Sequence, residues 1–275
     1  MELTPELLEP VVRAALAEDV GSGDRTTEGL VPADARCKAE LLLEEPGVVC
    51  GVAAARAVFQ ALDPGVRVEV VLADGSPITD VPALVATIEG PARAILTGER
   101  TALNIFGRLC GIATLTARYV NLLEGTGTSI LDTRKTTPGM RALERYAVRC
   151  GGGTNHRFGL HDAILVKENH LRIAGGIAPA VAALRNGRPI EIEAETLDDV
   201  AEALEAGVER ILLDNMTPEQ VRTAVELVDG RTELEASGGI SLATVRAYAD
   251  AGVDFISVGA LTHSARSLDV SLEVE

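Results

Sequence analysis

The cationic side chains between residues 130 and 172 are the groups whose types and spacing point most directly to chemistry. This segment holds eight Lys or Arg residues against four carboxylates, whereas the whole chain carries a formal net charge of −16. Two of the three lysines in the chain, Lys135 and Lys167, lie within it. A compact, strongly hydrated ammonium serves a different purpose from the planar guanidinium of Arg. The segment therefore indicates a site for a small anion, and its plainer alternative is a solvated basic face.

Six strand-like runs in the second half of the chain each end in polar residues or glycine. The runs are 129–131, 163–166, 190–194, 210–213, 233–236 and 254–258. In α/β barrels the working residues come from the C-terminal ends of the strands. At these ends the sequence places, in order, Arg134 and Lys135, Lys167 to His170, Glu193 to Glu195, Asp214 and Asn215, Ser237 to Gly239, and Gly259 and Ala260. The repeated pattern, more than any single residue, predicts one site.

Each of these strand ends suits a particular partner. The small residues at 237–239 and 259–260 resemble the phosphate-binding loops of many barrels, where backbone N–H groups close on an anion. Glu193 and Asp214 can hold Mg²⁺, which takes one or two carboxylates together with substrate phosphates. Tight turns are the plainer explanation for the glycines. Ion pairs with Arg134 or Lys167 are the plainer explanation for the two carboxylates.

Lys167 also allows a rival mechanism. A lysine at the end of a barrel strand, with its pKa lowered by neighbouring cations, can act as a Schiff-base nucleophile in an aldolase-like lyase. Nothing in the sequence excludes this, although the number of cations favours a site for anions. His161 and Cys150 are expected to be structural. The four cysteines are widely spaced without a CxxC pair, and reduced thiols are expected.

The first half of the chain is typical of an α+β layer. An amphipathic helix near the N-terminus, with Thr4 as its candidate cap, precedes a polar turn at 21–27. Short β-rich runs follow at 37–45, 48–50, 67–72 and 83–89, with a helix at 53–62 among them. One long helix or a broken pair is expected at 98–123. This order favours antiparallel strands with one face covered by helices.

The second half alternates strands and helices in the manner of a parallel α/β barrel. Three clear helices follow Thr196, Thr217 and Ser241, each a plausible N-cap. Six βα units fall short of the eight of a complete barrel. The sequence thus predicts an α+β open-faced layer over residues 1–113, an incomplete barrel of six to seven strands over 114–264, and a segment at 265–275 that packs back on the first domain.

Composition narrows the function classes. Aromatic residues make up 3% of the chain, there is no Trp, and the pI is near 4.7. These values disfavour a base-stacking or phosphate-backbone surface, so no nucleic-acid partner is expected. No apolar run approaches the length that spans a bilayer, and the N-terminal helix lacks the features of a signal peptide. A soluble cytoplasmic protein is expected.

Several long motifs resemble one family. DTRKTTPGMR, GGGTNHRFGLHDAILVKENH, EIEAE, ILLDNM, EASGGI and VGALTH, in this order and spacing, closely resemble quinolinate phosphoribosyltransferase (nicotinate-nucleotide pyrophosphorylase, carboxylating). GPARAILTGERTALN and EDVGSGDRTT extend the resemblance over nearly the whole chain. Ala194 departs from the β-branched residue more usual in the family, but it removes no ligand.

The resemblance implies a fold, a reaction and an assembly. It implies an N-terminal open-faced sandwich and a C-terminal incomplete barrel in an obligate homodimer, with assembly to a hexamer left open. It also implies that quinolinate and phosphoribosyl pyrophosphate give nicotinate mononucleotide, pyrophosphate and carbon dioxide, with Mg²⁺ and without an organic cofactor.

The resemblance further implies roles for individual residues. Arg134, His156, Arg157 and Lys167 would line the quinolinate site, with Arg100 entering from the partner subunit. Lys135 would straddle quinolinate and the phosphoribosyl group, and Glu193 and Asp214 would hold the ribose hydroxyls and Mg²⁺. These last three residues are the candidate catalytic groups. Ser237, Gly238, Gly239, Gly259 and His263 would bind the 5′-phosphate.

Three alternatives to a quinolinate phosphoribosyltransferase remain open. A paralogous phosphoribosyltransferase of the same fold would share the phosphate site without needing the full dicarboxylate pocket. The Lys167 lyase would form an imine with its substrate. A non-catalytic protein would bind the anion without turnover.

Overall fold

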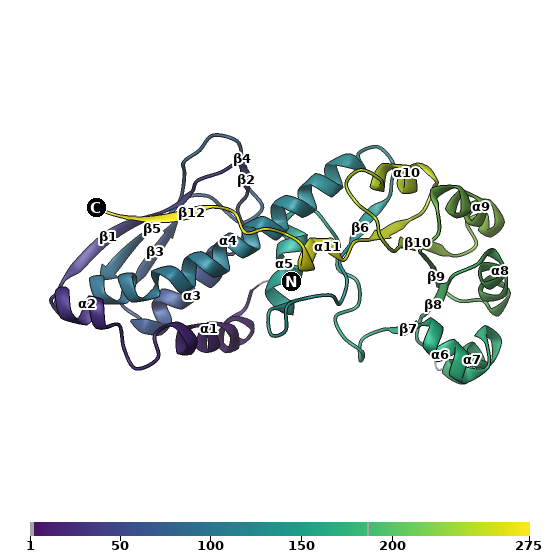
Figure 1. Ribbon diagram of the computed structural model, residues 1–275, viewed down its shortest axis with the longest axis horizontal. Helices are drawn as coiled ribbons and strands as arrows, with labels where there is room; N and C mark the ends of the chain where they lie inside the picture. Colours follow the sequence, from purple (N-terminus) through teal and green to yellow (C-terminus); the bar gives the residue numbers. More distant parts are fainter. Residues whose placement is uncertain (1–2, 186) are drawn as a thin grey trace. The chain divides into compact units, whose positions relative to one another are not determined.

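The computed structural model describes residues 3–185 and 187–275, and the chain divides into two compact units. The first unit runs up to Ala117 and adds residues 136–152 and 261–275 (Figure 1). The second comprises residues 118–135 and 153–260.

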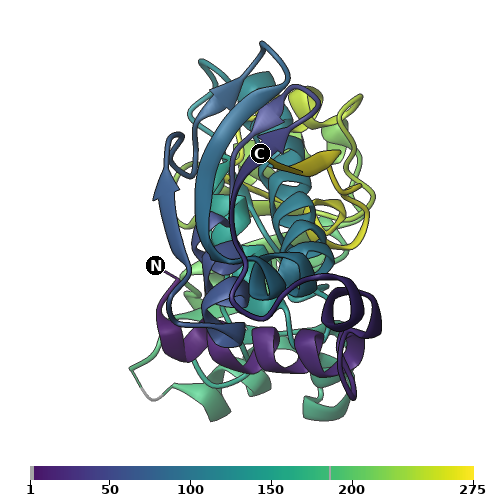
Figure 2. The same cartoon turned by 90° about the vertical axis from the view of Figure 1, so that its left-hand side faces the viewer.

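The first unit is built on an antiparallel sheet. Its elements are α1 (Pro5–Asp19), α2 (Arg25–Leu30), β1 (Arg36–Leu43), β2 (Gly47–Val48), α3 (Val52–Leu62), β3 (Arg67–Val70), β4 (Pro77–Ile78), β5 (Ala83–Pro91), α5 (Arg141–Cys150) and β12 (Val270–Val274). Most residues of α4 (Ala92–Leu122) and α11 (Ala260–His263) also belong to it, whereas residues 118–122 and 260 are grouped with the second unit. The sheet order is β12-β1-β5-β3, and β2 pairs separately with β4. In β1 the alternate residues Ala39, Leu41 and Leu43 are buried, which marks the covered face of the sheet. Figure 2 shows helices gathered on one side of these strands. The open-faced α+β layer is thus confirmed.

The C-terminal strand belongs to this sheet. β12 pairs antiparallel with β1, with Val274 opposite Ala39 and Val270 opposite Leu43. The predicted helix at 98–123 is one uninterrupted helix, α4, that begins earlier, at Ala92.

Residues 136–152 belong to the first unit, whereas the sequence prediction included them in the barrel domain of residues 114–264. They form α5 and pack in the first unit. The fully buried carboxylate of Glu144 accepts a hydrogen bond from Arg108 of α4 at 2.9 Å. A Cβ on Gly151 would lie 2.3 Å from the carbonyl oxygen of Ala113 in α4, so only glycine permits this approach. This long-range pairing is invisible in the local sequence pattern.

The second unit is a parallel α/β barrel that stays open. Its elements are β6 (Ser129–Leu131), β7 (Ile164–Val166), α6 (Glu168–Ala174), α7 (Ile177–Leu184), β8 (Ile190–Ala194), α8 (Leu197–Ala206), β9 (Arg210–Asp214), α9 (Pro218–Val228), β10 (Glu233–Ser237), α10 (Val245–Asp250) and β11 (Phe255–Ser257). The sheet order β6-β11-β10-β9-β8-β7 leaves β6 and β7 as the two edges. All pairs in this sheet are parallel. The expected incomplete barrel is therefore confirmed, with six strands.

Helix caps in this unit bear out the sequence signals in two cases of three. The Thr196 hydroxyl accepts from the Asp199 backbone N–H, and the Thr217 hydroxyl accepts from that of Gln220. Ser241 does not cap α10, because residues 241–244 form a turn and the helix begins only at Val245. None of the described helices combines the length and apolar character needed to cross a bilayer.

Candidate functional site

A cavity of about 510 Å³ opens at the C-terminal ends of the barrel strands. Strands that run parallel bring their carboxyl ends to the same edge, so residues distant in the sequence meet there. The cavity is lined by Thr133, Arg134, Lys135, His156, Arg157, Leu165, Lys167, Glu193, Leu212, Asp214, Asn215, Glu235, Ser237, Gly238, Gly239 and Ser257. Ten of the thirteen residues that the sequence singled out as site residues are among them.

The cations of the cavity come from the ends of β6 and β7 and from the segment after α5. The Nε atom of Arg134 is buried and has no hydrogen-bond partner within the described residues. Burial, and then the nearby charge of Arg134, lower the pKa of Arg157. One guanidinium nitrogen of Arg157 donates to the carbonyl oxygen of Ala163 at 3.2 Å. Each guanidinium group disfavours the charge of the other, so an anion that contacted both would relieve this repulsion.

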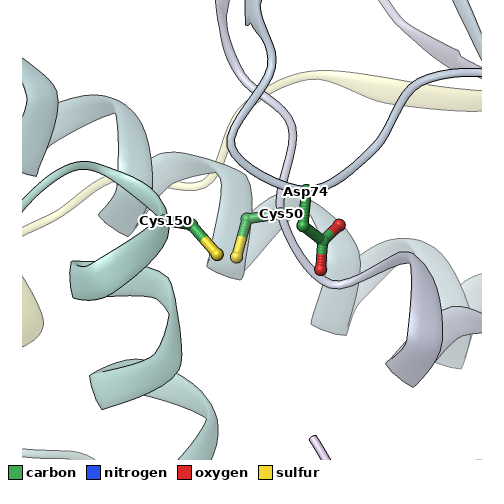
Figure 3. Close-up of side chains that lie close together, drawn as sticks. All are labelled: Cys50, Asp74 and Cys150. Carbon is green, nitrogen blue, oxygen red and sulfur yellow. The ribbon is translucent and has the colours of Figure 1, made fainter. Parts of the chain in front are cut away.

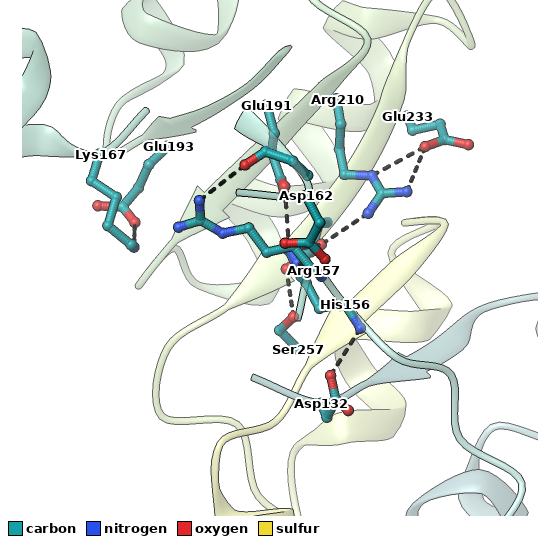
Figure 4. Close-up of polar contacts among 12 residues, drawn as sticks. Asp132, His156, Arg157, Asp162, Lys167, Glu191, Glu193, Arg210, Glu233 and Ser257 are labelled. Atoms are coloured by element: carbon teal, nitrogen blue, oxygen red, sulfur yellow. Dashed lines mark hydrogen bonds and ion pairs between the residues drawn. The ribbon is translucent and has the colours of Figure 1, made fainter. Parts of the chain in front are cut away.

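Asp132 holds the segment that carries His156 and Arg157 against the end of β6. Its buried carboxylate accepts from the Asn155 side chain at 2.5 Å and from the His156 backbone N–H at 2.8 Å. The backbone of Thr154 also donates to the carbonyl of Ile130 at 2.8 Å. These contacts fix the position of the two site cations that follow (Figure 4).

His156 lies between two buried carboxylates of neighbouring strands. Its Nε2 atom is 3.3 Å from Glu191 of β8 and 3.3 Å from Glu235 of β10. Burial alone would lower the pKa of His156, but hydrogen bonds and charge from the two glutamates outweigh it and raise the pKa to about 9. The Nδ1 atom faces the Arg157 backbone N–H at 2.6 Å, a contact that favours the neutral ring and opposes the same shift. Two carboxylates outweigh one backbone donor, so the ring is an imidazolium at neutral pH.

The two glutamates differ in their own surroundings. Burial raises the pKa of Glu191 more than the hydrogen bond from His156 lowers it. Burial also acts to raise the pKa of Glu235, yet the contacts with His156, Ser257 and Arg210 lower it below the usual range. Arg210 bridges Glu235 at 3.4 Å and Glu233 at 2.7 Å and lies over the Phe255 ring at 4.1 Å. The contacts with His156, Ser257 and Arg210 thus stabilise the charged form of Glu235. Figure 4 shows the neighbouring pair of Arg210 and Glu233.

The carboxylates at the strand ends form the other half of the cavity. Glu193 is nearly buried and makes an ion pair with Lys167, whose side chain is 47% exposed (Figure 4). The ion pair that the sequence left as a plainer explanation for Glu193 is therefore present. Asp214 accepts from the Asn215 side chain at 2.7 Å. Burial, followed by the nearby charge of Glu193, raises the pKa of Asp214.

The glycines after β10 shape a concave backbone surface. Gly238 and Gly239 have φ angles of 99° and 64°, in the left-handed region. A Cβ on Gly238 would lie 2.2 Å from Asn215 Oδ1, whereas one on Gly239 would meet nothing within 4 Å. Gly238 is therefore required by both space and backbone, and Gly239 by backbone alone. Consecutive backbone N–H groups in such a turn can enclose an anion.

Three of the expected site residues do not line this cavity: Arg100, Gly259 and His263. Arg100 is exposed on α4, in the first unit. Gly259 lies two residues after the end of β11 and directly before α11. His263 is exposed at the end of α11, and its Nδ1 lies 2.6 Å from the Ser264 hydroxyl. Their expected roles stay predictions.

Sequence reasoning missed the polar groups inside the barrel. Asp132, Glu191, Glu235, Arg210 and Ser257 were not recognised as part of the site. One signal was available, because Glu191 and Glu193 alternate in a strand whose five residues are all buried. Two charges on one face of a buried strand point to a polar interior.

An open parallel barrel with converging cations, paired carboxylates and a glycine turn defines an α/β-barrel protein built to bind anionic, phosphate-bearing molecules. Residues 24–110 match the family described as quinolinate phosphoribosyl transferase, N-terminal domain, and residues 112–273 match its C-terminal domain. The chain belongs to the quinolinate phosphoribosyltransferase family. The reaction of that family is quinolinate phosphoribosyl transfer with decarboxylation, in NAD biosynthesis.

Individual relatives are similar to this chain along nearly its whole length. It is 43% identical to a probable nicotinate-nucleotide pyrophosphorylase (carboxylating) of Synechocystis, over 98% of this chain and 92% of the relative. It is 42% identical to the nicotinate-nucleotide pyrophosphorylase (carboxylating) of Mycobacterium leprae, over 96% and 95%. The crystal structure of NadC from Streptococcus pyogenes superposes with a TM-score of 0.95 at 40% identity, covering 100% of this chain and 99% of that one.

Proposed function

We propose that this protein transfers the phosphoribosyl group of phosphoribosyl pyrophosphate to quinolinate and releases pyrophosphate and carbon dioxide, giving nicotinate mononucleotide. The observation that carries the proposal is the division of one cavity into two halves. Arg134, His156 and Arg157 supply fixed cations on one side. Asp214 and the 237–239 turn supply carboxylate and backbone N–H groups on the other. A dicarboxylate and a phosphorylated sugar match these halves in charge.

Quinolinate would bind to the cationic half. Arg134, Arg157 and Lys167 offer charge-assisted hydrogen bonds to its two carboxylates, and the charge of His156 adds to the attraction. Arg100 of a partner subunit would complete this half in a homodimer, which can assemble further to a hexamer. Lys135, at the boundary between the halves, would contact both quinolinate and the phosphoribosyl group.

The phosphoribosyl group would bind to the other half. Backbone N–H groups of residues 237–239, together with Gly259 and His263, would hold the 5′-phosphate. Glu193 and Asp214, at the ends of adjacent strands, suit the ribose hydroxyls and Mg²⁺. When bound, Mg²⁺ would neutralise charge on the departing pyrophosphate. No organic cofactor is needed for this chemistry.

The protein would accelerate the reaction through position and charge. As pyrophosphate leaves, positive charge grows on the ribose ring, and the carboxylates of Glu193 and Asp214 favour that charge. The cationic half holds quinolinate so that its ring nitrogen faces the anomeric carbon. Once this nitrogen is quaternary, the adjacent carboxylate leaves as carbon dioxide, because the ring cation stabilises the carbanion that remains. Lys135 would stabilise the anionic groups on both reactants.

A product assay separates this proposal from its alternatives. Purified protein is incubated with phosphoribosyl pyrophosphate, Mg²⁺ and either quinolinate or nicotinate, and pyridine nucleotide and carbon dioxide are measured. We expect nucleotide and carbon dioxide in equal amounts with quinolinate and no turnover with nicotinate. Turnover of nicotinate would indicate a paralogous phosphoribosyltransferase, and tight quinolinate binding without turnover would indicate a binding protein.

A trapping experiment tests the Schiff-base alternative. Borohydride added during turnover would attach substrate to Lys167 if an imine formed there. We expect the mass of the protein to stay unchanged. The place of action in the cell is proposed to be the cytoplasm, which fractionation of the source cells would test.

A further inference from the structure

Two cysteine sulfurs meet in the first unit, outside the barrel cavity. Cys50 lies between β2 and α3, and Cys150 is the last residue of α5. Their Sγ atoms and a carboxylate oxygen of Asp74 all lie within 4.8 Å of one another. Figure 3 shows the two sulfurs pointing toward each other. Residues 100 positions apart in the sequence are thus placed where their thiols can react together.

The carboxylate of Asp74 is already used by its surroundings. One oxygen accepts from the backbone N–H groups of Gly51 and Val52, at 3.0 and 3.2 Å, and so caps the start of α3. The other accepts from the Tyr146 hydroxyl at 2.8 Å. A metal ion bound by this cluster would have to compete with these three donors. The two sulfurs therefore favour a reaction with each other over shared coordination of a metal.

The two thiols differ in burial and in acidity. Cys50 is completely buried, and burial raises the pKa of its thiol well above the ordinary value. Cys150 is only partly buried, and the hydrogen bond from the Cys50 thiol outweighs the opposing effect of burial and lowers the pKa of Cys150. A thiolate is the form that reacts with oxidants. Cys150 is therefore the thiol that reacts first, and Cys50 is placed to react second.

The surroundings hold Cys150 in position. Gly151 packs directly on α4, where an added Cβ would lie 2.3 Å from the Ala113 carbonyl oxygen. Cys50 is held by its backbone N–H, which donates to Cys110 Sγ at 3.2 Å. The sulfur of Cys110 thus contacts the backbone of Cys50, and burial raises the pKa of the Cys110 thiol. Cys110 is therefore less reactive than Cys150.

We propose that Cys150 is a redox-sensitive thiol and that Cys50 resolves its oxidised form to a reversible Cys50–Cys150 disulfide. In the first step the Cys150 thiolate attacks a hydroperoxide, the O–O bond breaks, and the products are a sulfenic acid on Cys150 and, after protonation, an alcohol or water. In the second step the Cys50 sulfur attacks the Cys150 sulfur, and the hydroxyl leaves as water with the Cys50 proton. Two thiols lose two electrons in all, and the peroxide accepts them.

The test uses the full-length protein and hydrogen peroxide. Free thiols are counted after denaturation, and unreduced peptides are analysed by mass spectrometry. We expect the thiol count to fall from four to two, with a linked pair of peptides containing Cys50 and Cys150, and to return to four after treatment with a dithiol. The Cys37→Ser variant serves as the matched control and should form the same link.

Two variants separate the roles of the paired thiols. Cys50→Ser should leave a sulfenic acid on Cys150 that a dimedone probe labels. Cys150→Ser should keep its three thiols under the same conditions. Earlier oxidation of Cys37 or Cys110, sulfinic acid on Cys150 beside a free Cys50 in the unmodified protein, or one tightly bound zinc ion holding both thiols would each overturn the proposal.

Discussion

The charge of His156 gives the sharpest test of how the barrel interior serves the site. A rise in pKa from 6.5 to about 9 places the imidazolium in an environment that favours it by roughly 3 kcal/mol, at about 1.4 kcal/mol per pH unit. Glu191 and Glu235 lie at the same distance from Nε2, 3.3 Å, and act against the cost of burial. Their combined attraction therefore exceeds the net value of roughly 3 kcal/mol. If the two contribute equally, each supplies more than half of that net value.

Glu235→Gln keeps the shape of the side chain and removes its charge. We expect the pKa of His156 to fall by at least about one unit, because the attraction drops while the burial cost stays. The pH profile of the Michaelis constant for quinolinate should shift with it. In the unmodified protein the constant should rise as the pH passes 9, and in the variant the rise should begin nearer neutrality.

Titration by nuclear magnetic resonance measures the pKa of His156 directly. The chain has four histidines, and the His156→Asn variant assigns the signal of interest. Glu233→Gln is the matched control, since Glu233 pairs with Arg210 and is 53% exposed. A midpoint near 6.5 in the unmodified protein, or equal midpoints with and without Glu235, would refute the reasoning. It would mean that the Nδ1 contact with the Arg157 backbone prevails.

The same shift links His156 to stability. Its pKa is higher in the folded protein than in the unfolded chain, so its stabilising contribution is complete below about pH 6.5. That contribution, roughly 3 kcal/mol at most, is lost as the pH rises through 9. Urea unfolding at pH 6 and pH 10, with His156→Asn alongside, should show a difference that shrinks at the higher pH.

Four further substitutions test other parts of the structure. Arg134→Ala should weaken quinolinate binding roughly 10- to 100-fold, the value of a charge-assisted hydrogen bond, while Asp214→Ala should mainly weaken phosphoribosyl pyrophosphate and Mg²⁺ binding. Calorimetric titration distinguishes them, and equal effects of both variants on both substrates would contradict the division of the cavity. Gly238→Ala should reduce affinity for phosphoribosyl pyrophosphate at least about tenfold, because the turn cannot keep its shape; unchanged affinity would show that this turn binds no phosphate. Arg108→Ala should lower the free energy of unfolding by about 3 kcal/mol, because buried Glu144 loses its counter-charge and keeps only the hydrogen bonds from Thr137. Urea denaturation showing a loss of less than about 1 kcal/mol would argue against that pairing.

The sequence predicts those parts of the site that depend on strand direction alone. Lys135 and Lys167 follow a strand and Asp214 ends one, and parallel strands bring such positions to one edge. The structure places all three around the same cavity. The turn at Gly238 follows from the same rule, since a glycine pair after a strand marks a left-handed backbone.

Other features depend on contacts between distant residues. Glu235 lies within a strand, and its role depends on His156, which is 79 positions away and is placed by the hydrogen bonds of Asp132. No local pattern shows that pairing. The position of α5 likewise depends on Arg108, which precedes Glu144 by 36 residues. Local patterns therefore predict the helices, the strands and the strand ends. The pairing of buried charged residues can be identified only in the folded structure.

The ion pair between Lys167 and Glu193 explains why a lysine suits this position. It joins the cationic half of the cavity to the carboxylate half, so neither charge is left uncompensated. A dicarboxylate that enters the cationic half would take Glu193's place beside the ammonium and leave the carboxylate available to the sugar. Such an exchange requires a single mobile charge on a flexible stem. An arginine, with its planar fork, would bind Glu193 through two parallel hydrogen bonds and would exchange less readily. The presence of a lysine at this strand end, in a chain that uses arginine for most of its other cations, thus has a physical reason.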